Sequence, residues 1–259
     1  MRKERIEHYV NYIIKFIKNE LGKGKAVIGI SGGKDSTITA ALLCKALGPE
    51  NVIGVMMPNG EQSDIEDSIK VLNFLDIPSE NRKVLNIETA YLATIKELGF
   101  NTNTVPSMIK TNLPARLRMA NLYNVAALYQ NSRVINTCNL SENYVGYSTK
   151  FGDHAGDTGI LYDLTVKECL EIGDYLGLPY DLVHKKPSDG MCGKTDEDNL
   201  GFTYEELDNY ILNNEKPSND KLEKIEKLHT NNLHKLNPMP YPSRMLMELD
   251  YLSSVADEL

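Results

Sequence analysis

Hydrophobic and polar positions alternate along the first half of the chain in two patterns, one typical of helices and one of buried strands. Residues 3–21 place apolar side chains at i, i+3, i+4 and i+7 with charged residues opposite them, which predicts an amphipathic helix. Short apolar runs predict strands buried on both faces, and these runs lie at 26–30, 51–57, 83–87 and 133–137. The helices predicted between them are 38–47, 62–75 and 113–129. Because strands and helices alternate, we expect right-handed βαβ units and an α/β fold with a doubly wound parallel sheet.

The pattern changes after residue 140. Residues 141–160 are rich in Gly, Asp, Asn and Tyr, which predicts a loop or a short helix. Residues 184–201 contain little apolar material, which predicts a mobile loop. The later helices are predicted at 164–176, 204–212 and 221–236. We therefore expect residues 1–259 to form one domain, with an α/β core at 22–183 and, at 184–259, the mobile loop and a helical C-terminal extension.

Composition and charge exclude several classes of function. The chain has 259 residues, with 28 Lys and Arg against 36 Asp and Glu, so its formal net charge is −8. This balance argues against a nucleic-acid binder, which needs a surplus of basic side chains to displace counterions from phosphates. No apolar run approaches the ~20 residues of a membrane span, and the N-terminus lacks the uninterrupted apolar segment of a signal peptide. The cysteines form no CxxC pair, which predicts a cytoplasmic protein with reduced thiols. They are Cys44, Cys138, Cys169 and Cys192.

The candidate chemistry lies in the segment Ile28-Gly-Ile-Ser-Gly-Gly-Lys-Asp-Ser36, where a predicted strand ends and a helix begins. Adjacent glycines let backbone N–H groups approach an oxyanion, and the helix adds roughly +0.5 of a charge at its N-terminus. The spacing excludes a Walker A loop and the dinucleotide motif GxGxxG. A carboxylate in a phosphate loop would repel the ligand unless a cation lies between them, so Asp35 predicts a bound Mg²⁺. The alternative is a tight turn followed by an ordinary acidic residue at a helix N-terminus.

The string SGGKDS and its preceding strand resemble the pyrophosphate loop of the N-type ATP pyrophosphatases, whose fold is the Rossmann-like adenine nucleotide alpha hydrolase fold. Members of that superfamily adenylate a carbonyl or carboxyl oxygen, release pyrophosphate, and let a nitrogen or sulfur nucleophile displace AMP. Further segments resemble NAD synthetases, in the same order along the chain. They are Asn112-Leu-Pro-Ala-Arg-Leu-Arg-Met119, Asn136-Thr-Cys-Asn-Leu-Ser-Glu142, Tyr147-Ser-Thr-Lys-Phe-Gly-Asp153 with Asp157 after it, Lys185-Lys-Pro-Ser188, Thr195-Asp-Glu-Asp-Asn-Leu-Gly201 with Tyr204 and Asp208, and His234-Lys235 with Pro238.

The resemblance implies an enzyme that converts deamido-NAD, ATP and ammonia into NAD, AMP and pyrophosphate. It implies Asp35 and Asp153 as catalytic residues, and Asp35 with Glu142 as ligands of Mg²⁺. The ATP-binding residues it implies are Gly29, Ile30, Ser31, Gly32, Gly33, Lys34, Asp35, Ser36, Thr137, Lys185 and Ser188. The residues it implies for deamido-NAD are Arg116, Lys150, Asp157, His234 and Lys235. It also implies a homodimer, and free ammonia as the nitrogen donor because no cysteine lies in a recognisable nucleophile context.

Several of these side chains have a structural alternative. Arg116 could lie on a solvated helix face, Glu142 could be a helix N-terminal acid, and Lys150 with Asp153 could form a loop ion pair. The pair at 234–235 could interact with the dipole at a helix C-terminus. The rival functions are a GMP synthetase-like enzyme, a tRNA-thiolating enzyme, and a non-enzymatic nucleotide-binding regulator.

Three departures from the family pattern affect the site. The family lysine that follows Leu-Thr is replaced by Val166, the segment Pro187-Ser-Asp-Gly190 lacks the family alanine, and Asn136 stands where the family has Gly. Lys167 is one position further on, rotated by ~100° around the predicted helix, so it should point away from a site that position 166 faces. We therefore predict that Lys185, together with Ser188, covers the charge of the ATP triphosphate.

Overall fold

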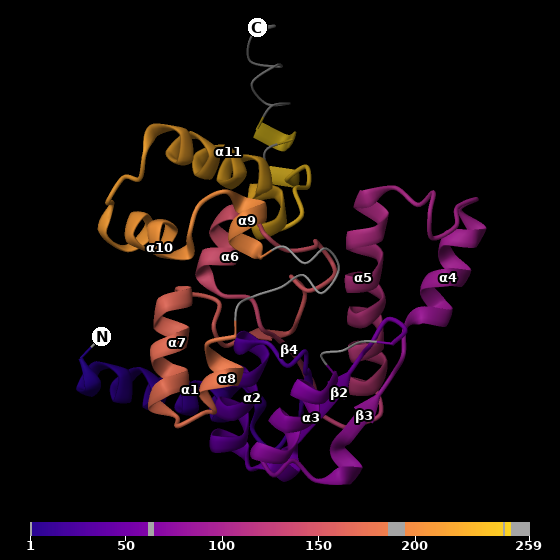
Figure 1. Cartoon of the computed structure of the whole chain (residues 1–259), viewed down its shortest axis with the longest axis vertical. Helices are drawn as coiled ribbons and strands as arrows, with labels where there is room; N and C mark the ends of the chain where they lie inside the picture. Colours follow the sequence, from indigo (N-terminus) through magenta and orange to yellow (C-terminus); the bar gives the residue numbers. More distant parts are fainter. Residues whose placement is uncertain (1, 62–64, 186–194, 246, 250–259) are drawn as a thin grey trace, which may run out of the picture.

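Parallel strands form the central sheet of the protein, in the order β3-β2-β1-β4-β5 (Figure 1). The computed structural model describes residues 2–61, 65–185, 195–245 and 247–249. The strands are β1 Ala26–Gly29, β2 Val52–Met56, β3 Arg82–Val84, β4 Arg133–Asn136 and β5 Thr158–Gly159. Ala26 of β1 is aligned with Val52 of β2 on one side and with Arg133 of β4 on the other. The chain runs outward from β1 in one direction to β3 and in the other to β5, so the topological switch point lies between β1 and β4.

Helices cover both faces of the sheet because successive residues of each buried strand point to opposite sides. Ile28 of β1 packs into one apolar cluster together with α1, α2, α3, α7 and α8, whereas its neighbour Val27 packs into a second cluster with α5. The first group of helices comprises α1 Lys3–Leu21, α2 Lys34–Leu47, α3 Ile65–Phe74, α7 Val166–Tyr175 and α8 Tyr180–Val183. On the other face α5 Ser107–Ala126 packs against β1 and β4, and α4 Glu88–Glu97 packs against α5. The predicted doubly wound α/β fold is confirmed.

A helical layer lies over the carboxyl ends of the strands (Figure 1). It consists of α6 Leu140–Val145, α9 Asp196–Leu200, α10 Tyr204–Asn213 and α11 Asn219–Leu236. These helices share a third apolar cluster, in which Tyr204, Leu207 and Ile225 pack against Val145 and Val166. The predicted helical C-terminal extension is therefore present and is joined to the sheet region through α6 and α7.

Some predicted boundaries were wrong. Helix α2 begins at Lys34 and not at Ile38, so the second half of the SGGKDS string forms the first helical turn. Helix α5 begins at Ser107 and not at residue 113, and it contains Pro114 in its interior. Helix α4, the two-residue strand β5, and the one-turn 3₁₀ helices η1 Pro49–Asn51 and η2 Ser79–Asn81 were not predicted.

The segment 184–201, predicted as a mobile loop, contains helix α9 at its end. The Thr195 hydroxyl accepts a hydrogen bond from the Asp198 N–H, and the Asp198 carboxylate accepts one from the Thr195 N–H, which forms a capping box. The prediction of a loop is thus wrong for 196–200, while 186–194 lies outside the described residues. Within the ranges that the structure describes, no helix is both long and apolar enough to cross a membrane.

Candidate active site

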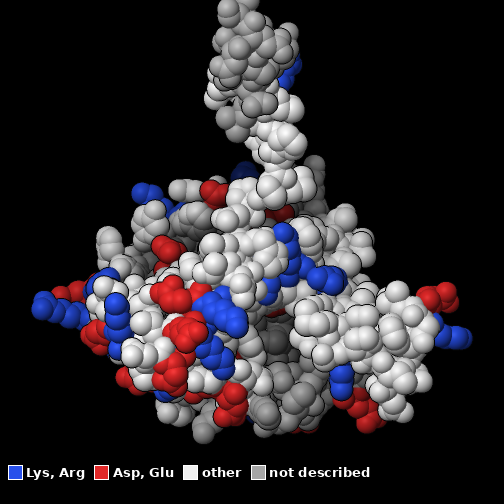
Figure 2. Space-filling model, turned by 90° about the horizontal axis from the view of Figure 1, so that it is seen from above, with Lys and Arg blue, Asp and Glu red and all other residues white. Residues whose placement is uncertain are grey.

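A cavity of about 750 Å³ opens at the carboxyl ends of β1, β2 and β4, at the switch point of the sheet. Figure 2 shows the molecule hollowed on this face, with Lys and Arg side chains beside the hollow. Most of the site residues predicted from the sequence line this cavity. These are Gly29, Ile30, Ser31, Gly33, Lys34, Asp35, Ser36, Thr137, Glu142, Asp153, Lys185 and Lys235.

The loop between β1 and α2 is shaped for an oxyanion. Its Gly32 has a φ of +77°, and a Cβ there would come within 2.8 Å of the Asp67 Cβ, so glycine is required at this position. Ser31 and Ser36 hold the loop together: their hydroxyls lie 3.0 Å apart, and the Gly33 N–H donates to the Ser31 Oγ at 3.2 Å. Gly33 is the N-cap of α2 and provides no capping side chain, so the first N–H groups of the helix remain available to a phosphate.

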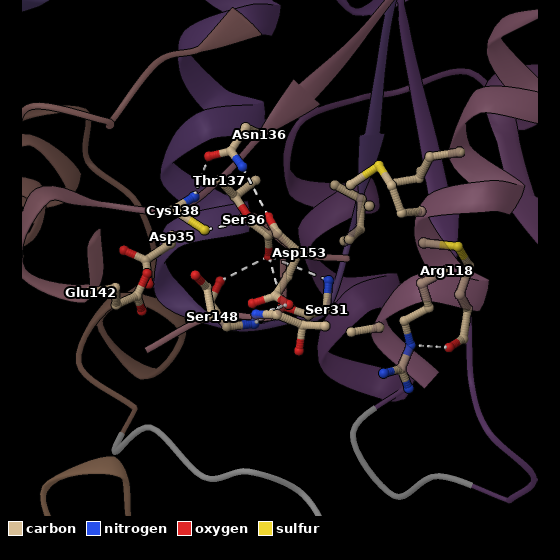
Figure 3. Close-up of a pocket in the computed structure, with 18 of the residues that line it drawn as sticks. Ser31, Asp35, Ser36, Arg118, Asn136, Thr137, Cys138, Glu142, Ser148 and Asp153 are labelled. Carbon is tan, nitrogen blue, oxygen red and sulfur yellow. Dashed lines mark hydrogen bonds between the residues drawn. The ribbon is translucent and has the colours of Figure 1, made fainter. Parts of the chain in front are cut away.

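Two carboxylates, from opposite sides of the switch point, face the same part of the cavity (Figure 3). Asp35 belongs to the first turn of α2, and Glu142 belongs to the first turn of α6. Asn139 connects them, because its backbone N–H donates to the Glu142 Oε2 at 3.3 Å and its Nδ2 donates to the Asp35 Oδ1 at 3.3 Å. Burial raises the pKa of Glu142, and the negative charge of Asp35 raises it further. The second effect indicates that the two acidic groups lie close together. Glu142 is thus both a helix-capping acid and a cavity residue.

This acidic pair could hold Mg²⁺, which proteins bind through one or two carboxylates together with substrate phosphates and water. Among the described residues, no group of three or more His, Cys, Asp or Glu side chains is arranged to hold a metal ion by itself. The Tyr204 hydroxyl is buried and has no hydrogen-bond partner in the described part of the chain. Burial, and then the charges of Glu142, Asp196 and Asp35, raise the pKa of Tyr204, so this hydroxyl lies in the field of the acidic pair. These oxygen donors fit a cation whose remaining ligands come from a bound nucleotide.

Asp153 occupies the middle of the cavity (Figure 3). Its Oδ1 accepts the Thr149 N–H at 2.9 Å, and its backbone carbonyl accepts the Asn136 Nδ2 at 2.9 Å. Asn136, which replaces the family glycine, therefore ties the end of β4 to the loop that carries Asp153. Asp153 is exposed to the cavity, and desolvation by the surrounding protein raises the pKa of its carboxyl.

Three further cationic side chains line the cavity. The Lys185 Nζ lies 2.7 Å from the Asp67 Oδ2, and the Lys235 Nζ donates to the Gly146 and Ser148 carbonyls at 2.6 and 2.8 Å. Arg118 lies on the opposite side from the acidic pair, and its Nε donates to the Met57 carbonyl at 2.9 Å (Figure 3).

Five predicted residues in the described part of the chain do not line the cavity. Arg116 donates through Nε to the Lys150 carbonyl at 3.3 Å, and Lys150 donates through Nζ to the His234 carbonyl at 2.6 Å. The His234 ring is exposed and contacts the Asn231 carbonyl. Asp157 accepts the Val134 N–H at 2.8 Å and thereby attaches its loop to β4. Gly32, which lies close to Asp67 and Ser68, is the fifth, and Ser188 lies outside the described residues.

The sequence argument did not assign Arg118 to the site, although the helical period could have identified it. The cavity-lining residues of α5 recur every three or four positions and so share one face of the helix; they are Met108, Thr111, Asn112, Ala115, Arg118, Met119 and Leu122. Arg116 is two positions from Arg118, roughly 200° around the helix, so the two side chains cannot share this face. Asn139 was also not singled out, and only the fold brings it next to Asp35.

The chain is similar to known proteins in both sequence and fold. The sequence pattern of the family described as NAD synthase matches residues 6–241. The chain belongs to the NAD synthase family. A curated family member, the ammonia-dependent NAD⁺ synthetase of Syntrophomonas wolfei subsp. wolfei, is 35% identical over 242 residues, which is 90% of this chain and 95% of that protein. The predictions of the NAD synthase family and of an ATP-using ligase are confirmed.

Two solved structures of similar proteins share the fold over nearly their whole length. The NMN synthetase of Francisella tularensis has a TM-score of 0.83 and 33% identity, covering 92% of this chain and 98% of that one. The ammonia-dependent NAD synthetase of Campylobacter jejuni, solved with a nitrate ion, has a TM-score of 0.74 and 27% identity, covering 94% and 100%.

Proposed function

We propose that this member of the NAD synthase family joins ammonia to the nicotinate carboxylate of deamido-NAD. In the first step the carboxylate attacks the α-phosphorus of ATP and pyrophosphate leaves. In the second step ammonia attacks the acyl-adenylate and AMP leaves, which forms the amide of NAD. The observation that carries this proposal is the glycine-containing loop at the start of α2, which opens into the same cavity as the Asp35–Glu142 pair.

The residues that line the cavity have different roles, according to their positions in it. The free N–H groups at the start of α2, with the Ser31 and Ser36 hydroxyls, bind the phosphates that leave as pyrophosphate. Asp35 and Glu142 would hold Mg²⁺, which when bound supplies positive charge to the triphosphate. Asp153, in the middle of the cavity, is placed to accept a proton from the attacking nitrogen, and its raised pKa favours this role. Lys185 adds a cation on the side of the phosphate loop.

The test is an incubation of the purified chain with ATP, Mg²⁺, ammonium and deamido-NAD. The proposal requires NAD and AMP in equal amounts. Formation of ADP in place of AMP would contradict adenylation, and a lack of NAD with intact nucleotide binding would favour a regulator over an enzyme.

A second candidate substrate is nicotinate mononucleotide, the half of deamido-NAD that carries the carboxylate. The observation that favours it is the similarity to the NMN synthetase of Francisella tularensis over nearly both complete chains. Both reactions amidate the same ring and differ only in whether an adenylate half must also be bound. The ratio of kcat/KM for the two substrates decides between them, with a ratio above about tenfold corresponding to 1.4 kcal/mol of discrimination.

We propose that the nitrogen donor is free ammonia. The use of glutamine requires an activated nucleophile such as a low-pKa cysteine thiolate. Burial raises the pKa of Cys44, Cys138 and Cys169 instead, so the cysteines of the described part are unreactive. Glutamine alone should therefore support no product formation, and equal rates with glutamine and ammonium would contradict the proposal.

We propose further that the protein acts in the cytoplasm as a homodimer, with residues 1–259 as one functional unit of core (22–183) and extension (184–259). Free thiols fit a reducing compartment. Apolar side chains are exposed near the cavity on and beside α5, which favours a second copy of the chain as the partner. They are Met108, Tyr123, Leu128 and Phe151. Sedimentation at micromolar concentration tests the dimer against the 29.0 kDa monomer.

A further inference from the structure

Lys34 follows the two glycines of the SGGKDS loop and is buried beside the acidic pair. Only 6% of its side chain is exposed, and its Nζ lies 2.8 Å from the Asp35 Oδ2. The same Nζ lies 5.6 Å from the centre of the Tyr204 ring, within cation–π range. A carboxylate at this distance favours the charged form of the ammonium.

Both oxygens of Asp35 have a partner without any metal ion. The Asn139 Nδ2 donates to Oδ1 at 3.3 Å, and the Lys34 Nζ donates to Oδ2. Two neighbouring carboxylates in a partly desolvated wall are unfavourable unless a positive charge balances them. The Lys34 Nζ contacts the Asp35 carboxylate directly, and its charge also acts on Glu142.

We propose that Lys34 is the resident counter-cation of the Asp35–Glu142 pair and gives up the Asp35 Oδ2 when Mg²⁺ binds. This inference rests on the Mg²⁺ site of the proposed function. It makes Lys34 a positioning residue that keeps the loop and the pair in place before the nucleotide arrives. It also makes Lys34 the residue that weakens Mg²⁺ binding in the absence of ATP, because two cations then compete for one carboxylate.

The Tyr204 ring gives the displaced ammonium a second binding surface. Tyr204 belongs to α10, in the helical layer over the sheet, and is itself 5% exposed. The Lys34 ammonium can leave Asp35 and still keep its contact with the face of the Tyr204 ring. Mg²⁺ binding therefore need not move the Lys34 side chain out of the cavity wall. The ring thereby couples the phosphate loop to the C-terminal helices.

The experiment measures Mg²⁺ binding and thermal unfolding of the full chain without nucleotide, at constant ionic strength. Lys34→Gln removes the charge and retains a donor for Asp35, whereas Lys34→Arg retains the charge. Lys45→Gln is the matched control, because Lys45 is exposed in the last turn of the same helix. In Lys34→Gln we expect the Mg²⁺ dissociation constant to fall at least about tenfold, since a unit charge close to the site is removed. Its metal-free Tm should fall and should recover with MgCl₂, whereas Lys34→Arg and Lys45→Gln should bind Mg²⁺ as the unmodified chain does.

Equal Mg²⁺ affinity in Lys34→Gln and the unmodified chain would overturn the proposal. So would a Lys34→Gln chain that fails to fold even in saturating MgCl₂, because Mg²⁺ should then replace the missing charge. Asp35→Asn in the same titration separates this result from a failure of the metal site itself. If Asp35→Asn binds Mg²⁺ as well as the unmodified chain, Asp35 is not a ligand; if it loses binding while Lys34→Gln is unchanged, only the role of Lys34 is refuted.

Discussion

Replacing Lys185 by alanine should impair the use of ATP, whereas replacing Lys167 should have little effect. Lys185 lines the cavity, and its Nζ lies 2.7 Å from the Asp67 Oδ2. Lys167 is exposed, and its backbone N–H donates to the Asp208 Oδ2 at 3.0 Å, which fixes the start of α7 against α10. Val166, at the position of the family lysine, is buried in the apolar cluster of the C-terminal helices. Of Lys167 and Lys185, the structure thus places Lys185 in the cavity with the phosphate loop.

The magnitude follows from two opposing contributions. A charged hydrogen bond to a phosphate is worth about 1.5–3 kcal/mol. Lys185 must first leave Asp67, and a partly exposed ion pair of this kind contributes up to about 1 kcal/mol. The net contribution is roughly 1–2 kcal/mol, which corresponds to a loss of roughly five- to thirtyfold in kcat/KM for ATP.

The assay is steady-state kinetics with varied ATP at saturating Mg²⁺ and ammonium, with AMP as the measured product. Tm values of both variants serve as the control for folding. A larger loss in Lys167→Ala than in Lys185→Ala would refute the reasoning, since it would mean that Lys167 reaches the triphosphate despite its place on α7.

The remaining predictions concern the metal ligand, the arginines of α5 and the pH dependence of stability. Asp35→Asn should abolish NAD formation while cooperative unfolding persists, because Asn keeps the volume and an oxygen for its neighbours; activity at ordinary Mg²⁺ concentration would contradict this. Arg118→Ala should lower kcat/KM about tenfold or more through the loss of a cavity cation, and Arg116→Ala less than about threefold, so the reverse order would place Arg116 in the site. The hydrogen bond from Lys185 lowers the pKa of Asp67 below its ordinary 3.8, so the stability from this pair is present above that pH and is lost as the pH falls through the lowered pKa. The Tm difference between the unmodified chain and Lys185→Ala should therefore shrink below about pH 3.8, and a constant difference from pH 3 to 7 would rule out this ion pair.

Local signals were sufficient to locate the phosphate loop and the strands of the core. Gly32 is required by its own backbone conformation, and β1 is a continuous apolar run, so both can be identified from a few neighbouring residues. The start of α2 was misplaced because Gly33 caps the helix without a side chain, and no Ser, Thr, Asp or Asn occupies that position.

Features that depend on distant contacts could not be predicted. Strand β5 exists because Thr158 and Gly159 are paired with the end of β4, and two residues carry no recognisable pattern of their own. Arg118 and not Arg116 lines the cavity because the orientation of α5 on the sheet selects one face of that helix. Motif resemblance identifies the pair of arginines but does not say which of them faces the ligand.

The bridge that Asn139 forms between the two carboxylates has a consequence for how the chain acquires its activity. Asp35 and Asn139 are 104 positions apart in the sequence, and they meet only after β1 and β4 have paired. Contacts of such long sequence separation form slowly, since the entropy of closing the intervening chain must be overcome first. A nascent or truncated chain that ends before residue 133 has the phosphate loop but lacks the second acid, so turnover should appear late in refolding, after most helical signal has returned.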